Sequence, residues 1–155
     1  MGKTVTQIEA ESTQAPSCKV ALVNSEDIEL VWDEVIPLVE KALPHAEGEL
    51  KPEDIRKHLD TGDLRLWVAL QDRDIIASMV TEIIQYPRKK IVRVITVAGK
   101  DMSMWYDFLP MLEGYAVRNG CSSLEAWTRK GMTRKLKDWK HSYDIITKDL
   151  KQRMQ

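Results

Sequence analysis

The clearest signal of secondary structure lies in residues 64–97, LRLWVALQDRDIIASMVTEIIQYPRKKIVRVITV. This stretch contains three apolar, β-branched runs over 64–70, 75–86 and 91–97, separated by two short polar links. Runs of this kind joined by tight turns predict an antiparallel meander. The sequence therefore places three neighbouring strands at the centre of the chain.

The residues before this meander predict one strand and two helices. CKVALV, residues 18–23, is a short apolar run that is typical of a strand. Apolar residues then recur at helical spacing over 28–43, where we expect Pro37 to kink or split the helix. A second helix opens at Pro52 and ends at Gly62, because proline suits the first turn and glycine the residue after the last.

The residues after the meander predict two further helices and two further strands. A helical stripe runs from Met104 to Ala116, and Pro110 predicts that this helix is kinked or begins nearer Asp107. A short strand over 124–127, a short helix over 130–137 and a last strand over 143–150 follow.

The predicted order β-α-α-β-β-β-α-β-α-β defines the fold class. An order that mixes a meander with β-α-β units requires an α+β fold, a mixed sheet with helices on both faces. Residues 1–17 are polar and predict a flexible arm, residues 18–150 a single domain, and residues 151–155 a short tail.

Composition excludes several classes of protein. The 155 residues are 43% hydrophobic and carry a net charge of −1, which is typical of one globular domain. No apolar run approaches the roughly 18 residues that cross a bilayer, and residues 1–17 do not resemble a secretory signal. Two cysteines and three dispersed histidines predict neither a disulfide framework nor a metal site, so we expect a reducing, intracellular setting.

Charge is unevenly distributed along the chain. Residues 25–63 hold 12 acidic and 4 basic side chains, residues 86–100 hold 5 basic and no acidic ones, and residues 127–140 hold 6 basic and 1 acidic. Opposite faces of this kind suit self-assembly, an acidic partner or a phosphate-bearing ligand. Solvated charged faces remain the alternative.

The most basic stretch is WTRKGMTRKLKDWK, residues 127–140. A solvated helix whose tryptophans pack on the sheet, a protein-binding surface and a nucleic-acid-binding surface are all compatible with this pattern. We also expect Trp105 to be exposed as an interface anchor. The candidate interaction residues are Trp105, Arg129, Lys130, Arg134, Lys135 and Lys137.

Three strings carry a resemblance to a known family: GDLRLWVAL (62–70), TEIIQYPRKKIVRVITVAGKD (81–101) and GYAVRNGCSSLEAWTRKGMTRKLKD (114–138). With the predicted element order they resemble the GNAT superfamily of acyl-CoA N-acyltransferases. They are similar in particular to the small GNAT-like proteins encoded by tailed bacteriophages. The resemblance covers about residues 18–150 and implies a protein made in the host cytoplasm and associated with the virion.

The resemblance also implies where an acyl-CoA would bind. Active members carry Arg/Gln-x-x-Gly-x-Gly/Ala between the fourth strand and the next helix, where backbone N–H groups hold the pyrophosphate. The matching candidates here are Val97, Gly99, Lys100 and Ser103, with one glycine in place of two. Asp101 adds a carboxylate that repels phosphate by about 1 kcal/mol. The resemblance therefore predicts weakened or absent binding of CoA.

The resemblance also implies that the set of catalytic residues is incomplete. Many active members protonate the leaving thiolate with a tyrosine, and Leu136 stands at that position here. Glu82 is the candidate base and Tyr143, or a water, the candidate acid.

Two functional hypotheses follow. The leading one is a non-catalytic, virion-associated component that uses no cofactor. Its expected partners are copies of itself or other virion proteins. Nucleic acid ranks lower as a partner, and binding to a membrane is not expected. The alternative is an active N-acyltransferase that uses acetyl-CoA on an unknown amine.

Overall fold

The computed structural model describes residues 19–43, 50–99, 104–126, 136, 138–142 and 144–150. Its strands are β1 (Lys19–Val23), β2 (Arg65–Gln71), β3 (Asp74–Gln85), β4 (Lys90–Gly99) and β5 (Ser123–Ala126). Its helices are the 3₁₀ turn η1 (Ser25–Asp27), α2 (Ile28–Ala42), α3 (Pro52–Thr61) and α4 (Met104–Arg118). These elements follow the predicted order as far as β5.

The described strands form a single sheet in the order β1-β2-β3-β4-β5. The first four strands pair antiparallel with their neighbours in sequence, because short turns join β2 to β3 and β3 to β4. β5 pairs parallel to β4, since the helix α4 carries the chain back between them. The predicted meander and the mixed, α+β character of the fold are therefore confirmed.

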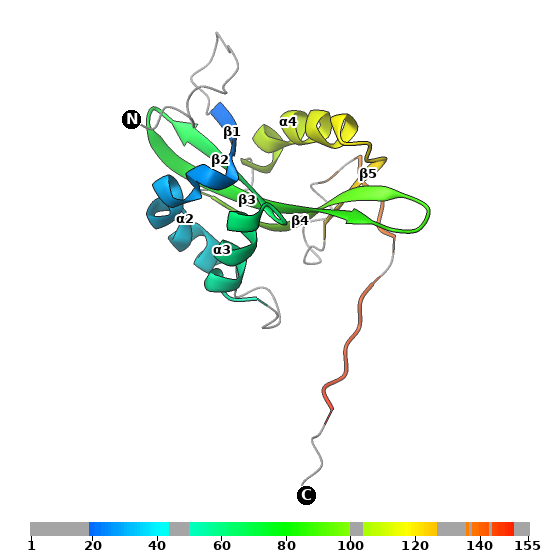
Figure 1. The fold of residues 1–155 in the computed structure, drawn as a ribbon. Helices are drawn as coiled ribbons and strands as arrows, with labels where there is room; N and C mark the ends of the chain where they lie inside the picture. The colour runs from blue at the N-terminus through cyan, green and yellow to red at the C-terminus, as the bar shows by residue number, and fades with distance from the viewer. Residues whose placement is uncertain are drawn as a thin grey trace, which may run out of the picture.

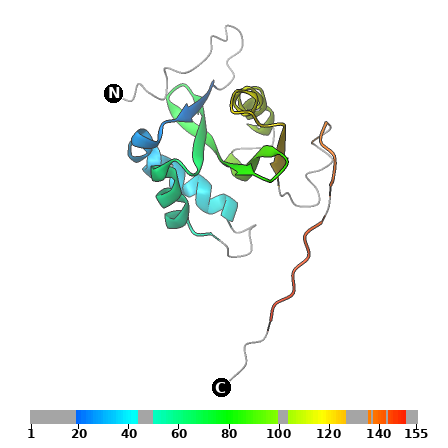
Figure 2. The ribbon, with the colours of Figure 1, turned by 45° about the vertical axis from the view of Figure 1, so that its right-hand side comes forward.

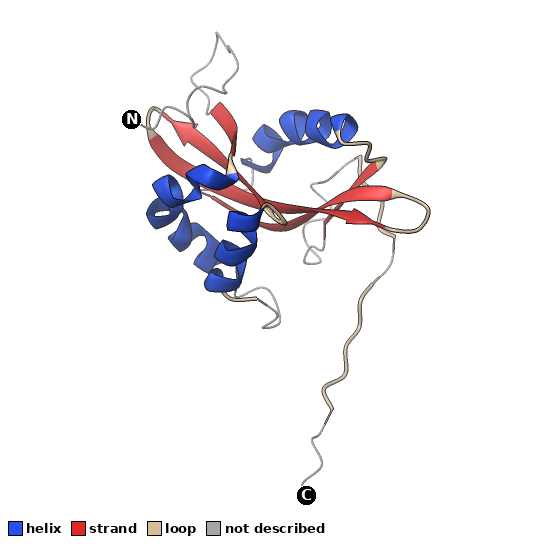
Figure 3. Cartoon of the chain, viewed as in Figure 1, coloured by secondary structure: helices blue, strands red, loops and turns tan. Residues whose placement is uncertain are grey.

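Helices cover both faces of the sheet. Figures 1 and 3 show α2 and α3 on one face and α4 on the other. On the α2–α3 side, Leu66, Val68 and Val80 lie in one buried cluster with Val35 and Ile55. On the α4 side, Trp67, Met79, Phe108 and Leu112 belong to a second buried cluster. Alternate residues of β2 and β3 thus serve different cores, as the two-residue period of a strand requires.

Helix boundaries agree with the sequence at α3. Pro52 opens this helix, and the backbone N–H of Lys51 donates to the Asp54 carboxylate, 3.0 Å away. Gly62 ends it in the left-handed conformation, with φ of 87°, which glycine adopts without steric cost.

The structure excludes one of the two alternatives expected at each proline. α2 continues through Pro37 without being split, and α4 begins at Met104 rather than near Asp107 although it contains Pro110. Both prolines are exposed, so the side of the helix that loses a hydrogen bond faces water.

The described part of the last predicted strand, residues 144–150, does not form a strand. Residues 144–150 are extended and exposed and pair with no described strand, so the prediction of a strand over 143–150 was wrong for the single chain. The predicted helix over 130–137 lies outside the described residues except for Leu136. No helix among the described residues has the length and apolar character needed to cross a membrane.

Candidate functional site

The neighbouring strands β4 and β5 separate along part of their length. Parallel pairing joins Ile91–Val94 of β4 to Ser123–Ala126 of β5 and ends there. β4 nevertheless continues to Gly99, paired on its other edge with β3 as far as Ala77. Among the described residues, nothing pairs with the other edge of Ile95–Gly99, which we call the open edge of β4. Backbone groups alternate between the two edges of a strand, so alternate residues of this five-residue segment offer N–H and C=O groups there.

A β-bulge lies at the point where the strands separate. Thr81 pairs with Val94 and Val80 pairs with Thr96, so Ile95 has no partner in β3. Because a bulge bends its strand and increases the local twist, β4 changes direction directly after its last pair with β5. The bulge also reverses the side-chain alternation: Val94 and Val97 both pack in the α4-side core.

A row of charged side chains crosses the sheet one residue before the separation. Glu82, Arg93 and Glu125 are register partners on β3, β4 and β5. Arg93 donates from Nε to Glu125, 2.7 Å away, and from Nη2 to the Tyr86 hydroxyl, 3.0 Å away. Burial lowers the pKa of Arg93, but the hydrogen bonds and charges of Glu125 and Tyr86 together raise it above its ordinary value. The guanidinium therefore fixes β5 to β4 at the start of the gap.

The far end of the open edge carries a positive charge. Lys41, near the end of α2, donates from Nζ to the carbonyl oxygen of Gly99, 3.0 Å away. α4 starts at Met104, and the positive end of a helix dipole favours anions. Lys100 and Ser103, which lie between these two points in the sequence, are outside the described residues.

The structure places three of the predicted site residues on two neighbouring strands. Glu82, Val97 and Gly99 lie on β3 and β4, with Val97 and Gly99 on the open edge. Glu82 is half-buried and stands beside Arg93, not alone in solvent. Tyr143, the candidate acid, lies outside the described residues, as do the basic interaction candidates Arg129, Lys130, Arg134, Lys135 and Lys137.

The expected exposure of Trp105 was wrong. Its side chain is 3% exposed and packs in the α4-side core. The centroids of the Trp105 and Trp139 rings are 5.7 Å apart. The physical reason is helical position: Trp105, Phe108 and Leu112 share the inner face of α4. Leu136, at the position that the resemblance assigns to a general acid, belongs to the same core and is 4% exposed.

Arg93, Glu125 and Lys41 are site residues that sequence reasoning missed. One signal was available, because Arg93 interrupts the apolar strand IVRVITV and a half-buried arginine needs an anionic partner. Nothing local pointed to Glu125 or Lys41, since their partners are 32 and 58 residues away in sequence. Among the described residues, no group of three metal-ligating side chains comes together.

Comparisons with known proteins identify the fold. No family model matches the sequence, and the search of curated proteins gives no match. Solved structures do match. An aminoglycoside acetyltransferase from an uncultured soil metagenomic sample, in complex with sisomicin, has a TM-score of 0.62 and 15% identity. The match covers 86% of this chain and 97% of that one.

Two further structures agree with the first. A GNAT family acetyltransferase from Staphylococcus aureus has a TM-score of 0.62 and 15% identity over 86% of this chain and 99% of its own. The aminoglycoside N-acetyltransferase AAC(6')-Iy in complex with CoA has a TM-score of 0.64 and 12% identity over 90% and 99%. The chain has the GNAT acetyltransferase fold, and this confirms the fold that the resemblance implied.

Proposed function

We propose that the protein is an acyl-CoA-dependent N-acyltransferase that binds its acyl donor along the open edge of β4. The observation that carries the proposal is the five-residue extension of β4 past its last pair with β5, within a GNAT fold. An extended chain that contains amides can hydrogen-bond to such an edge in the way that an added strand does. The pantetheine arm of CoA is a chain of this kind, so the open edge fits it.

The charged row beside the gap supports a role for Glu82. An acyl-CoA supplies an activated thioester, and the attacking amine must lose a proton during transfer. Glu82 lies opposite Arg93 in register, one residue before the strands separate, and its carboxylate is the candidate acceptor for that proton. Arg93 donates to Glu125 and Tyr86, and the half-buried Glu82 carboxylate lies beside it on β3.

Calorimetric titration with acetyl-CoA tests donor binding. We expect a Kd in the micromolar range, about −8 kcal/mol. Asp101→Gly should tighten binding about five-fold if the carboxylate repels the pyrophosphate. An absence of heat at high protein concentration contradicts the proposal, and an unchanged Kd in Asp101→Gly contradicts the electrostatic argument alone.

Release of free CoA thiol in the presence of a panel of amines tests the transfer step. Glu82→Gln should lower the turnover rate at least ten-fold, as expected for loss of a general base, and leave the Kd for acetyl-CoA nearly unchanged. Glu113→Gln is the matched control, because Glu113 is an exposed glutamate on α4. Equal rates in the two variants would remove Glu82 from the mechanism.

A second candidate function is a non-catalytic, virion-associated interaction component of a tailed phage, which needs no cofactor. The observation that favours it is Leu136, a buried hydrocarbon side chain at the position that the resemblance gives to the general acid. This candidate predicts no binding of acetyl-CoA and the presence of the protein in purified virions. Acyl transfer to any amine at a rate above the uncatalysed reaction excludes it.

A further inference from the structure

Lys41 is the one basic side chain in a strongly acidic part of the chain. Residues 25–43, which form η1 and α2, contain six carboxylates and this single lysine. The positions three and four residues before it on α2 hold Leu38 and Pro37, so no carboxylate precedes it at the spacing of a helical ion pair. The partner of this ammonium group therefore comes from another element.

That partner is the last residue of the open edge of β4. The Lys41 Nζ donates to the carbonyl oxygen of Gly99, 3.0 Å away. It reaches this carbonyl from the α2 side, since Figures 1 and 2 show α2 and α4 on opposite faces of the sheet. An ammonium group has three N–H donors, and the Lys41 side chain is exposed. Gly99 occupies one donor, which leaves two that a ligand at this end of the edge can accept from.

The two ends of the open edge define the direction of the acyl donor in the proposed complex. Glu82 marks the reacting end, because it lies opposite Arg93, one residue before β4 and β5 separate. Gly99 marks the other end, about 13 Å beyond Ile95 along an extended strand. A donor whose thioester lies near Glu82 therefore directs its phosphate groups past Gly99.

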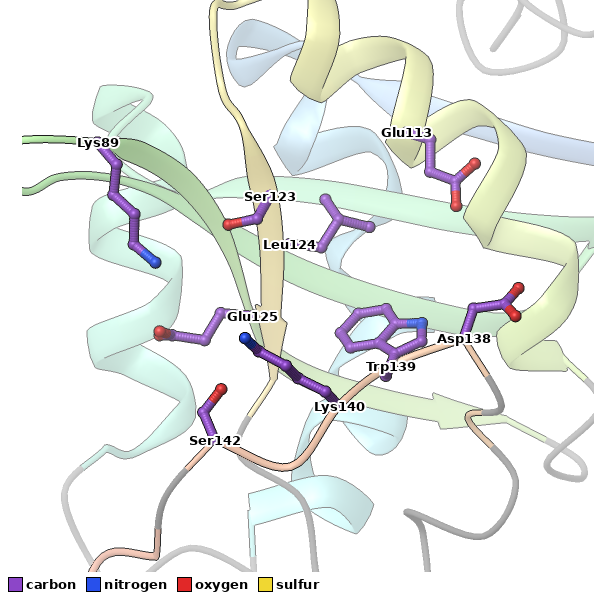
Figure 4. A pocket seen from close by; sticks show the side chains of 9 residues that line it. All are labelled: Lys89, Glu113, Ser123, Leu124, Glu125, Asp138, Trp139, Lys140 and Ser142. Carbon is purple, nitrogen blue, oxygen red and sulfur yellow. The ribbon is translucent and has the colours of Figure 1, made fainter.

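A groove beside β5 offers phosphate groups a less favourable environment. It has a volume of about 450 Å³ and lies between β5, α4 and the segment 138–142 (Figure 4). Its charged lining consists of three carboxylates and two ammonium groups, from Glu113, Glu125, Asp138, Lys89 and Lys140. Carboxylates repel phosphate, so the charge in this groove does not select an anion. The end of the open edge at Gly99 has the more suitable charge.

We propose that Lys41 binds the phosphate groups of the acyl donor. A hydrogen bond from an ammonium group to a phosphate is stronger than one to a neutral carbonyl, because both partners are charged. α4 begins at Met104, and the positive end of its dipole acts in the same direction. The inference rests on the proposed function and adds to it a donor-binding residue on α2.

Lys41 offsets a deficiency in the stretch that follows the open edge. Residues 97–103 contain one glycine and the carboxylate of Asp101, which disfavours an anion. A positive side chain from a different element compensates for that carboxylate without any change in the stretch itself. Lys41 is 58 residues away from Gly99 in sequence, so inspection of residues 97–103 alone does not find it.

Calorimetric titration of the full-length chain with two donors tests the inference. S-acetylpantetheine contains the thioester and the amide chain of acetyl-CoA but no phosphate group. Lys41→Gln should raise the Kd for acetyl-CoA about five-fold and change that for S-acetylpantetheine less than about two-fold. Lys41→Arg keeps the charge and should bind acetyl-CoA within about two-fold of the original chain. Lys57→Gln, which removes the same charge from an exposed position on α3, is the matched control and should change neither Kd.

Salt provides a second measurement. Because salt screens exposed charges, the Kd for acetyl-CoA should rise less steeply with salt in Lys41→Gln than in the original chain. An equal rise of both Kd values in Lys41→Gln overturns the proposal, since Lys41 then serves only to hold Gly99 in place. An unchanged Kd for acetyl-CoA overturns it as well and leaves the proposed function intact. An original chain that binds no acetyl-CoA removes both. Circular dichroism of each variant confirms that the domain is folded.

Discussion

The contact between Arg93 and Glu125 gives the most direct test of how β4 and β5 are held together. In Glu125→Gln, a hydrogen bond of 2.7 Å between two opposite charges is replaced by one in which only the guanidinium is charged. The two side chains are 18% and 23% exposed, so solvent screens the pair only in part. Hydrogen bonds to charged groups contribute about 1.5–3 kcal/mol. Because glutamine keeps an acceptor oxygen, we expect stability to fall by about 1–2 kcal/mol.

Urea unfolding followed by tryptophan fluorescence measures this loss. For a chain of this size about 1–2 kcal/mol corresponds to a decrease in Tm of about 2–8 °C. The m-value should be unchanged, since the same surface is exposed on unfolding. Glu113→Gln, at an exposed site on α4, is the control and should change stability by less than about 0.5 kcal/mol.

The dependence on pH is part of the same test. A group whose pKa is raised in the folded state stabilises the fold below its ordinary pKa and loses that effect only as the pH rises through the raised value. The pKa of Arg93 is raised, so its contribution should be the same at about pH 7 and pH 9. A loss below about 0.5 kcal/mol in Glu125→Gln, or a loss equal to that of the control, would show that the ion pair does not stabilise the fold.

Three further predictions concern buried or constrained positions. Thr81→Val leaves the buried Trp67 indole N–H, now 3.0 Å from the Thr81 hydroxyl, without an acceptor, and calorimetry should show a loss of about 1–3 kcal/mol. Adding Trp67→Phe should recover part of that loss, and strict additivity would contradict it. Gly62→Ala should lower the free energy of chemical unfolding by about 1–2 kcal/mol, because alanine is strained at the positive φ of this position. Steric clash adds nothing to this loss, since no atom lies within 4 Å of the added Cβ. In Cys18→Ser, which leaves a single thiol, Cys121 is 8% exposed and should react with a thiol reagent at the rate of protein opening; immediate reaction in the native state would show that it is accessible.

The sequence was sufficient to predict the central sheet because its signals there are local. The run 64–97 alternates apolar residues between short polar turns, and the structure follows it with boundaries moved by one or two residues. Gly62 likewise ends its helix as its conformational freedom predicts. Where one short stretch contains the whole signal, local pattern was enough.

Features that depend on distant partners could not be predicted in this way. The bulge at Ile95 is a property of the register between β3 and β4, not of the string IVRVITV. Trp105 was expected at the surface because the pattern alone did not show that Trp139 packs against it from 34 residues away. The segment 144–150 has the composition of a strand, but a strand forms only where a neighbouring edge accepts its hydrogen bonds. Several candidate site residues lie outside the described part of the chain and stay predictions.

The separation between β4 and β5 divides the described sheet into two parts that differ in how local their contacts are. β1 to β4 are each hydrogen-bonded to the next strand along the chain, and two tight turns join the last three, so their contacts are mostly local. β5 follows α4 along the chain, and four residue pairs hold it to β4. In hydrogen–deuterium exchange the amides of β2 and β3 should therefore be protected longest. The amides of β5 should exchange through a separate local opening that has a lower free energy. The proposed donor-binding gap is then a boundary between two cooperative units, and a ligand bound across it would couple their opening.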